Sequence, residues 1–171
     1  NAVAQGYTSD LVARFLSSKE ISNFMVEVGG EIMAMGISSR GTPWIVGIDK
    51  PVENALPGEN LQAKFYFSGS RGMSTSGNYR KFIEVNGIKY AHTINPKTGF
   101  PAMSNLLSAT VIAPTAARAD ALATAFMVNG LEWSRNFVNS HTGVEAYLIY
   151  SDSTGKFNEW VSEGLKSSIA Q

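Results

Sequence analysis

The sequence contains no cysteine, little charge and only two histidines. Without cysteine, the chain cannot use a thiol nucleophile, a thiolate metal site or a disulfide bond. Its 14 Lys and Arg residues balance its 14 Asp and Glu residues, and no basic run occurs, so we expect no nucleic-acid partner. No apolar run approaches the roughly 20 residues of a membrane-spanning helix. Hydrophobic residues make up 44% of the 171 residues, which is typical of a globular chain with one core.

Runs of β-branched and aromatic residues, bounded by Gly, Pro and Asn, predict strands along most of the chain. The clearest hairpin covers 81–94, where two alternating runs flank Asn86-Gly87, a pair typical of a type I′ turn. The first three predicted strands follow one another through short turns, which favours an antiparallel meander. In chain order, the strands outside this hairpin are predicted at 23–30, 31–37, 44–49, 61–69, 107–113, 145–151 and 156–162.

The strongest helix signal lies at 115–130, where alanine dominates. Thr115 can cap its start and Gly130 can end it, and a second helix is predicted directly after it, at 131–140. Helices and strands together predict one α+β domain over 1–171, with helices packed against a largely antiparallel sheet.

A shorter helix is predicted near the start of the chain, over 8–20, with Thr8 or Ser9 as its cap. Its apolar side chains fall on one stripe. The stripe consists of Leu11, Val12, Phe15 and Leu16.

The helix at 115–130 carries the first candidate site. Asp120 and Thr124 are four residues apart, so they lie one above the other on one face, and alanines flank them. A carboxylate and a hydroxyl are hard oxygen ligands that suit Mg²⁺, which completes its coordination with phosphate and water. The alternative is that Asp120 is solvated or pairs with Arg118.

His92 lies near the end of the predicted hairpin and directly before the turn 95–101. A histidine in this position can act as a general base near neutral pH, or it can satisfy the carbonyl groups of the turn.

Two glycine-containing segments complete the set of candidates. Gly29-Gly30 permits a close backbone approach or a positive φ, either to admit a cofactor or to form a bulge. The segment 74–80, STSGNYR, can offer hydrogen-bond donors to a phosphate or a flavin carbonyl, or it is an ordinary polar loop. It is not a Walker motif, because the G-x-x-x-x-G-K pattern is absent.

Taken in their order along the chain, the four candidate segments just described resemble those of the ApbE family, the FAD:protein FMN transferases. The combination of S-T-S-G-x-Y, H-x-I-[DN]-P-x-T-G and A-D-A-L-A-T-A is highly specific. The resemblance is carried by 4–16, 26–32, 44–51, 74–79, 92–101 and 109–130.

The resemblance implies an ApbE-like fold and a set of roles for individual residues. Mg²⁺ would be held by Asp120, Thr124 and a carbonyl group at Ala2. The turn 95–101 would pack against FAD, with the backbone of Ile94 in contact with it. His92 would be the base that activates a threonine hydroxyl of an acceptor protein.

The implied reaction breaks the pyrophosphate of FAD, joins FMN to the acceptor through a phosphoester and releases AMP. The family's acceptors are subunits of membrane redox complexes, of the sodium-translocating NADH:quinone reductase and Rnf types. Two alternatives stay open, namely an FAD pyrophosphatase that yields FMN and AMP, and a flavin-binding fragment without catalysis.

This sequence departs from the family pattern at two positions. Gln5, at a cofactor-binding position, replaces a lysine that many members have, so a salt bridge to FAD is in doubt there. Asn95 replaces an aspartate, a mild change because both residues can hydrogen-bond to the turn backbone.

The chain begins at Asn1 without a methionine, and no signal peptide is visible. The resemblance starts part-way into the family sequence, so we expect the intact protein to carry a further N-terminal portion that supplies part of the FAD site. It also implies that a lipid anchor in the intact precursor holds the protein on the periplasmic side of the bacterial inner membrane.

Overall fold

The computed structural model of the chain describes residues 3–50, 56, 58–67, 69–78, 82–85, 88–91 and 93–170, without the side chains of 82–85 and 88–91. The helices are α1 (Ala4–Ser18), α2 (Ala116–Asn129), α3 (Leu131–Ser140) and α4 (Glu163–Lys166). The strands are β1 (Phe24–Val28), β2 (Glu31–Met35), β3 (Trp44–Asp49), β4 (Leu61–Phe67), β5 (Arg71–Gly77), β6 (Phe82–Val85), β7 (Ile88–Ala91), β8 (Leu106–Ala113), β9 (Glu145–Ser151) and β10 (Phe157–Val161).

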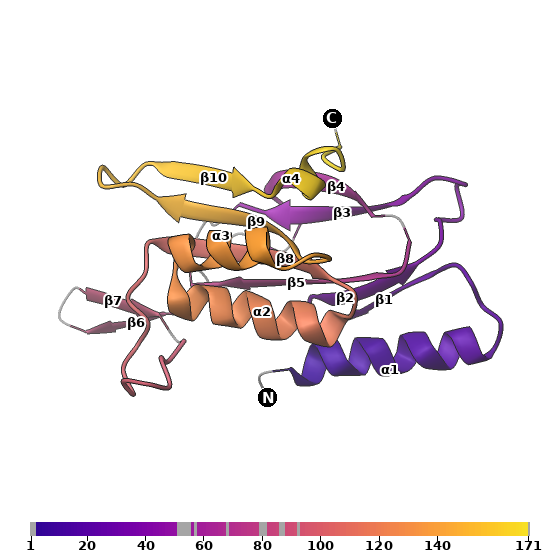
Figure 1. The fold of residues 1–171 in the computed structure, drawn as a ribbon, viewed down its shortest axis with the longest axis horizontal. Coiled ribbons are helices and arrows are strands. Elements are labelled where there is room, and N and C mark those ends of the chain that lie inside the picture. The colour runs from indigo at the N-terminus through magenta and orange to yellow at the C-terminus, as the bar shows by residue number, and fades with distance from the viewer. Residues whose placement is uncertain are drawn as a thin grey trace.

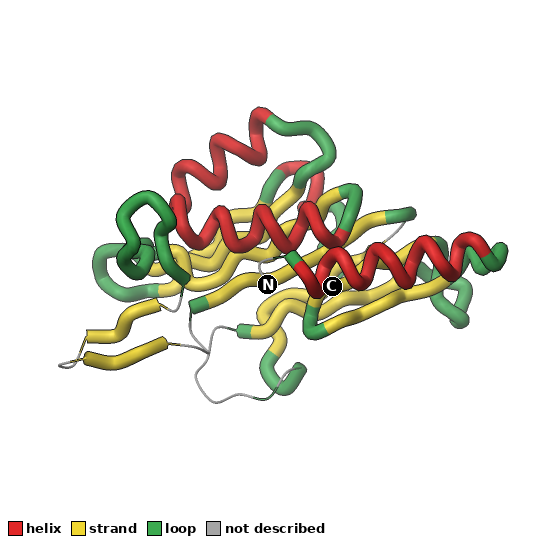
Figure 2. The backbone as a smooth tube through the Cα atoms, turned by 90° about the horizontal axis from the view of Figure 1, so that it is seen from below, coloured by secondary structure: helices red, strands yellow, loops and turns green. Residues whose placement is uncertain are grey.

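A six-stranded antiparallel sheet in the order β1-β2-β5-β8-β9-β10 forms the centre of the fold (Figure 1). The helices α1, α2 and α3 lie on one side of the strands, as the view from below shows (Figure 2). The hairpins β3-β4 and β6-β7 form two separate two-stranded sheets. The expected α+β class with a largely antiparallel sheet is therefore confirmed.

Hydrophobic cores fill both sides of this sheet. The β3-β4 hairpin packs against the side opposite α2, where Phe65 and Phe67 meet Ile112 and Tyr147. On the helix side, residues of β8 and β9 pack against the apolar positions of α2 and α3. This core contains Leu106, Ala109, Val111, Ala113, Ala119, Ala123, Phe126, Met127, Val138, Val144, Ala146 and Leu148.

Several predicted elements are confirmed. Thr115 caps α2 by accepting a hydrogen bond from the N–H of Arg118 at 3.2 Å, and Gly130, with φ 81°, ends the helix. The strands β6 and β7 form the predicted hairpin, whose turn residues lie outside the described part of the chain.

The predicted meander is only partly correct. β1 and β2 do form an antiparallel hairpin, but the next strand along the chain, β3, pairs with β4 and not with β2. The free edge of β2 is taken by β5, which lies much further along the chain. Short connections favour pairing between neighbours, and here the packing of β3-β4 on the opposite side of the sheet overrides that preference.

The alternative that 74–80 is an ordinary polar loop is wrong for 74–77, because Arg71–Gly77 forms β5 between β2 and β8, while Tyr79 and Arg80 lie outside the described residues. Its small residues are needed for packing: a Cβ on Gly72 would overlap the backbone of Ala116 at the start of α2. Residues that look like loop residues therefore allow α2 to lie close to the sheet.

The first helix also differs from its prediction. α1 begins at Ala4, so Thr8 and Ser9 lie inside it and do not cap it. The predicted apolar stripe is largely exposed, with Phe15 61% accessible to solvent. The buried face is small and polar, and it consists of Gly6, Ser9, Asp10 and Ala13.

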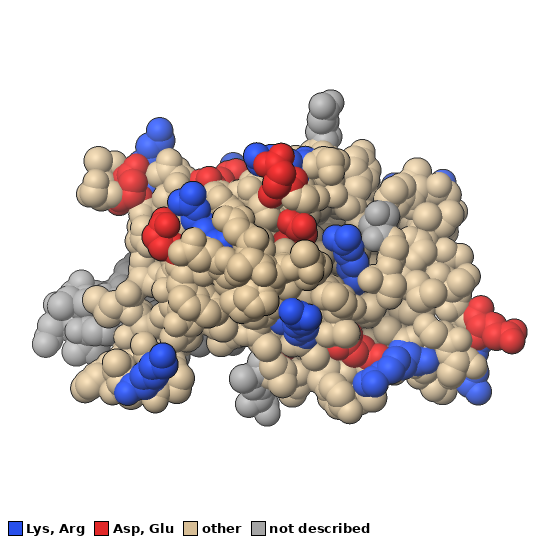
Figure 3. All heavy atoms as spheres, in the orientation of Figure 1, with Lys and Arg blue, Asp and Glu red and all other residues tan. Residues whose placement is uncertain are grey.

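Surface charge is scattered on the face shown in Figure 3, where neither sign gathers over one element. Within the described residues, none of the helices has both the length and the apolar character needed to cross a membrane.

The close approach of α1 to α2 depends on Gly6. A Cβ at this position would lie 2.6 Å from the carbonyl oxygen of Ala116 and 2.9 Å from the Cβ of Asp120. Backbone atoms cannot move aside cheaply, so the two helices can cross here only if this position carries no side chain.

We expect Gly6→Ala to lower the free energy of unfolding by about 1–3 kcal/mol, the usual range for overpacking. Helix propensity alone would raise it by about 1 kcal/mol, so the sign of the change is diagnostic. Urea unfolding measures it, with Thr8→Ala on the exposed side of α1 as a control expected to stay within about 0.5 kcal/mol. A more stable Gly6→Ala protein would show that the helices can separate without cost.

Candidate active site between α1, α2 and β5

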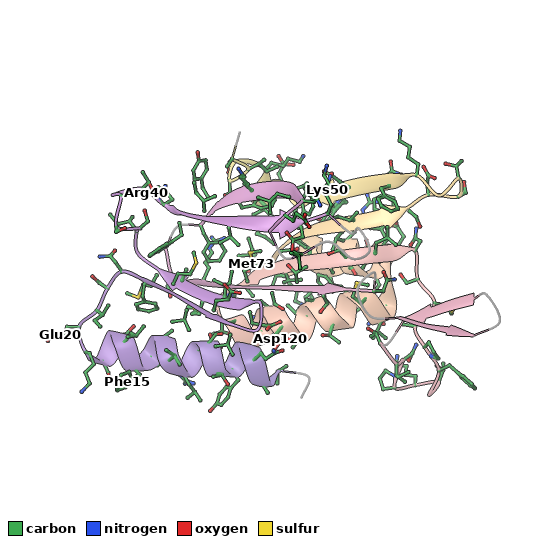
Figure 4. The ribbon with its side chains drawn as sticks, turned by 180° about the vertical axis from the view of Figure 1, so that it is seen from behind. Phe15, Glu20, Arg40, Lys50, Met73 and Asp120 are labelled. Carbon is green, nitrogen blue, oxygen red and sulfur yellow. The ribbon has the colours of Figure 1, made fainter. Side chains whose placement is uncertain are left out.

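Asp120 lies where the N-terminal end of α1 meets α2, close to the β1-β2 hairpin (Figure 4). Its side chain is buried, and its Oδ2 accepts a hydrogen bond from the N–H of Gly6 at 3.1 Å. The N–H of Gly6 belongs to the first turn of α1, where N–H groups have no partner within the helix. Asp120 therefore stabilises the start of α1, and no ion pair joins it to Arg118 among the described residues.

Asp10 makes the reciprocal contact from α1 to α2. Its Oδ1 accepts from the N–H of Ala116 at 2.8 Å, and its Oδ2 accepts from the N–H of Ala117 at 3.0 Å. With the Thr115 cap on Arg118, all of the first three N–H groups of α2 have side-chain partners. Each helix thus provides a carboxylate to the N-terminal end of the other.

β5 presents three small residues to the helices at alternate positions, as the period of a strand requires. Gly72 lies against the start of α2, Ser74 donates to Glu31 Oε1 at 3.4 Å, and the Ser76 hydroxyl lies 3.3 Å from Thr124 Oγ1. Within the segment 74–80, singled out from the sequence for its hydroxyl groups, Ser76 therefore meets the helix that carries Asp120 and Thr124.

Glu31 is the residue of this site that sequence reasoning missed. It is the first residue of β2 and only 8% exposed, although glutamate is almost never buried without a partner. Its position in the sequence could have identified it, because Glu31 directly follows Gly29-Gly30 and begins a strand otherwise made of apolar residues. A charged residue in such a strand needs a specific reason to be there.

The pKa values of the two buried acids are both raised, and Asp120 contributes to the shift of Glu31. Burial raises the pKa of Asp120, while the hydrogen bond from Gly6 lowers it. Burial also raises the pKa of Glu31, and the negative charge of nearby Asp120 raises it further. The negative charge of Asp120 therefore opposes the ionisation of Glu31.

The Gly29-Gly30 turn has the predicted positive φ angles, 67° and 106°. The side chain of Gln5 lies directly against it, since a Cβ on Gly29 would overlap the Gln5 amide. This contact brings the predicted cofactor-binding residue Gln5 to the turn that precedes Glu31.

The other predicted site residues belong to the turn after β7 or lie outside the described residues. Ile94 forms an isolated β-bridge with Pro101 and is 49% exposed, and Asn95 Oδ1 accepts from the N–H of Lys97 at 2.9 Å, as expected for this turn. Ala2 and His92 lie outside the described residues, so their roles stay predictions.

The oxygen atoms at this site suit a hard cation. In the part of the chain that the structure describes, no three His, Cys, Asp or Glu side chains gather into a metal-binding group. Mg²⁺ needs no such group, because it is commonly held by one or two carboxylates, with water and phosphate as its other ligands. Asp120, with one oxygen bound to Gly6, and the adjacent hydroxyls of Thr124 and Ser76 therefore fit Mg²⁺.

A family model described as the ApbE family matches residues 1–148. The chain belongs to the ApbE family. It is 38% identical over 167 residues to the FAD:protein FMN transferase of Escherichia coli (strain K12), a match that covers 98% of this chain and 46% of that relative. The FAD:protein FMN transferase of Vibrio cholerae serotype O1 is 34% identical over 172 residues, covering 100% of this chain and 49% of the relative.

Solved structures of ApbE proteins have the same fold. The flavin transferase ApbE from Vibrio cholerae matches with a TM-score of 0.82 at 32% identity, over 98% of this chain and 51% of that one. The apo form of Pseudomonas stutzeri flavinyl transferase ApbE matches with a TM-score of 0.81 at 33% identity, over 98% and 50%. The family membership expected from the sequence is confirmed, and the chain spans about half the length of these relatives.

The raised pKa of Glu31 makes stability depend on pH in the absence of metal. The unfolded chain releases this proton near the ordinary value of 4.5, whereas the folded chain keeps it to higher pH. Between these two pKa values the folded state binds more protons, so its stability falls as pH rises.

We therefore expect Glu31→Gln, measured in EDTA, to be more stable than the unaltered protein at neutral pH. The difference should shrink towards about pH 4, where the carboxyl group is protonated in both states. Urea unfolding from about pH 4 to about pH 8 checks this. Equal slopes for the two proteins would show that Glu31 does not titrate abnormally.

Proposed function

We propose that this chain forms the cation-binding and base-bearing part of a FAD:protein FMN transferase. The observation that carries the proposal is the buried carboxylate of Asp120 beside Thr124 and Ser76, in a chain 38% identical to a protein of that name over 98% of its length. A buried acid whose pKa is raised, placed among hydroxyl groups, is a candidate for ligand binding and not for packing.

In the proposed reaction, a threonine hydroxyl of an acceptor protein attacks the phosphorus on the FMN side of the FAD pyrophosphate. The new bond is a phosphoester, the bond between phosphorus and the bridging oxygen breaks, and AMP leaves with that oxygen. His92 accepts the hydroxyl proton. With water as the nucleophile, the same steps give FMN and AMP.

The chain's own residues bind and orient the reactants. Asp120, Thr124 and the carbonyl group of Ala2 would hold Mg²⁺, which when bound neutralises charge on the pyrophosphate oxygens. Gln5 and the backbone of Ile94 would contact FAD. The contact of Gln5 with the Gly29-Gly30 turn supports its part in this proposal, because it places an amide donor on the side of the site where Glu31 lies.

The proposed acceptors are flavoprotein subunits of membrane redox complexes of the NADH:quinone reductase or Rnf type. The proposed location is the periplasmic side of the bacterial inner membrane, reached by a lipid anchor of the intact precursor.

Incubation with FAD, Mg²⁺ and an acceptor domain tests the function. The proposal expects AMP release together with flavin fluorescence that stays on the acceptor in a denaturing gel. AMP release without labelled acceptor would favour the pyrophosphatase, and FAD binding without AMP release would favour a flavin-binding fragment.

We expect Asp120→Asn to reduce Mg²⁺-dependent AMP release by about 10²-fold or more, because a metal stabilises transition-state charge by several kcal/mol. The fold should be retained, since the asparagine oxygen can still accept from Gly6. Glu132→Gln on exposed α3, which removes a charge remote from the site, is the matched control and should leave turnover unchanged. Undiminished turnover in Asp120→Asn would show that Asp120 does not hold Mg²⁺ in the reaction.

We expect His92→Ala to reduce AMP release at saturating FAD by roughly 10²–10⁴-fold while FAD affinity stays within about tenfold, as for loss of a general base. The chain's second histidine supplies the control, because His141 stacks on Phe137 at the exposed end of α3. His141→Ala should therefore turn over normally. Weakened FAD binding with an unchanged rate at saturation would instead make His92 a structural residue of the turn.

A further inference from the structure

The oxygen atoms of Glu31 are incompletely satisfied. Oε1 accepts one long hydrogen bond, from the Ser74 hydroxyl at 3.4 Å. Oε2 is buried and has no hydrogen-bond partner within the described residues. Buried carboxylate oxygens are normally paired, so an unpartnered one points to a missing ligand.

The surroundings of Glu31 make this ligand a cation. The negative charge of Asp120 raises the pKa of Glu31, and the exposed acid Glu27 raises it to a smaller extent. No Lys or Arg side chain forms an ion pair with Glu31 in the part of the chain that the structure describes. Two buried like charges without a protein counter-ion are stable together when a positive ligand lies between them.

α1 fixes the positions of both carboxylates. The N–H of Gly6 binds the side chain of Asp120, and three residues later the Ser9 hydroxyl donates to the backbone carbonyl of Glu31 at 2.8 Å. Both donors lie on the buried face of this helix. One helix thus contacts both the side chain of an acid on α2 and the backbone of an acid on β2, and fixing both in this way is the preorganisation that a cation site requires.

We propose that Glu31 is the second carboxylate of the divalent-cation site, holding the ion together with Asp120. This inference rests on the proposed function for the presence of a cation at Asp120. Two carboxylates offset the charge of Mg²⁺, and two is within the number that protein sites commonly give this ion. Ser74 positions Glu31 by donating to Oε1, which leaves Oε2 for the ion.

Calorimetric titration with MgCl₂, in the absence of FAD, tests the proposal on three variants. Glu31→Gln keeps the size and the Ser74 contact but removes the charge, and it should weaken Mg²⁺ binding by about tenfold or more. Asp120→Asn should weaken it as well. Glu27→Gln is the matched control, because Glu27 is an exposed acid on the neighbouring strand, and binding should stay within about twofold.

The double variant gives a second readout. If the two acids hold one ion, the losses of Mg²⁺ affinity caused by the two substitutions should not add. The double variant should then bind Mg²⁺ about as weakly as whichever single variant has lost more affinity. The rise in melting temperature caused by Mg²⁺ should also disappear in Glu31→Gln, even though that variant is expected to be more stable without metal.

The outcomes separate this inference from the proposed function. Normal Mg²⁺ binding by Glu31→Gln, with binding lost in Asp120→Asn, would overturn the role of Glu31 and leave the cation site of the proposed function standing. Normal binding by both variants, or no binding by the unaltered protein at millimolar Mg²⁺, would overturn both.

Discussion

The contact between α1 and α2 depends on two carboxylates, each of which binds backbone N–H groups at the start of the other helix. A helix start carries a partial positive charge and N–H groups without partners, so it favours a negative side chain. Gly6 makes the exchange possible, because any larger residue would hold the helices apart. In this arrangement α1 also binds the side chain of Asp120 and the backbone carbonyl of Glu31.

The same arrangement explains how a carboxylate can be kept buried at the site. Asp120 satisfies α1 with one oxygen, and Ser9 holds the backbone at Glu31 without using the acid itself. One acid oxygen is therefore used to stabilise the fold, and another, Oε2 of Glu31, has no hydrogen-bond partner in the part of the chain that the structure describes. A protein selected for stability alone would replace such an acid by an apolar residue. The proposed cation would supply the partner that this acid lacks among the described residues.

The sequence was sufficient for features that depend on neighbouring residues. The caps of α2 and the spacing of Asp120 and Thr124 on one helix face are set by local geometry, so they could be predicted. The family motifs added the fold and the family membership, which the comparisons confirmed.

Features that depend on distant contacts could not be predicted in this way. The bond from Gly6 to Asp120 joins residues 114 apart in the chain, and the one from Ala116 to Asp10 joins residues 106 apart. β5 has a composition typical of a loop, and it becomes a strand because β2 and β8 pair with its two edges. The sequence predicts an apolar stripe on α1, but this stripe is largely exposed, whereas the exchange of carboxylates turns the small, polar face of the helix inward.

The reciprocal contact also bears on how such proteins diverge. Gly6 and Asp10 on α1 match Ala116 and Asp120 on α2, so a change on either helix alters the fit of the other. Substitutions at these four positions are therefore expected to occur together. An α1 transplanted from a distant relative would lack the matching residues on α2. The first helix of this fold is therefore expected to be exchangeable between relatives only together with α2.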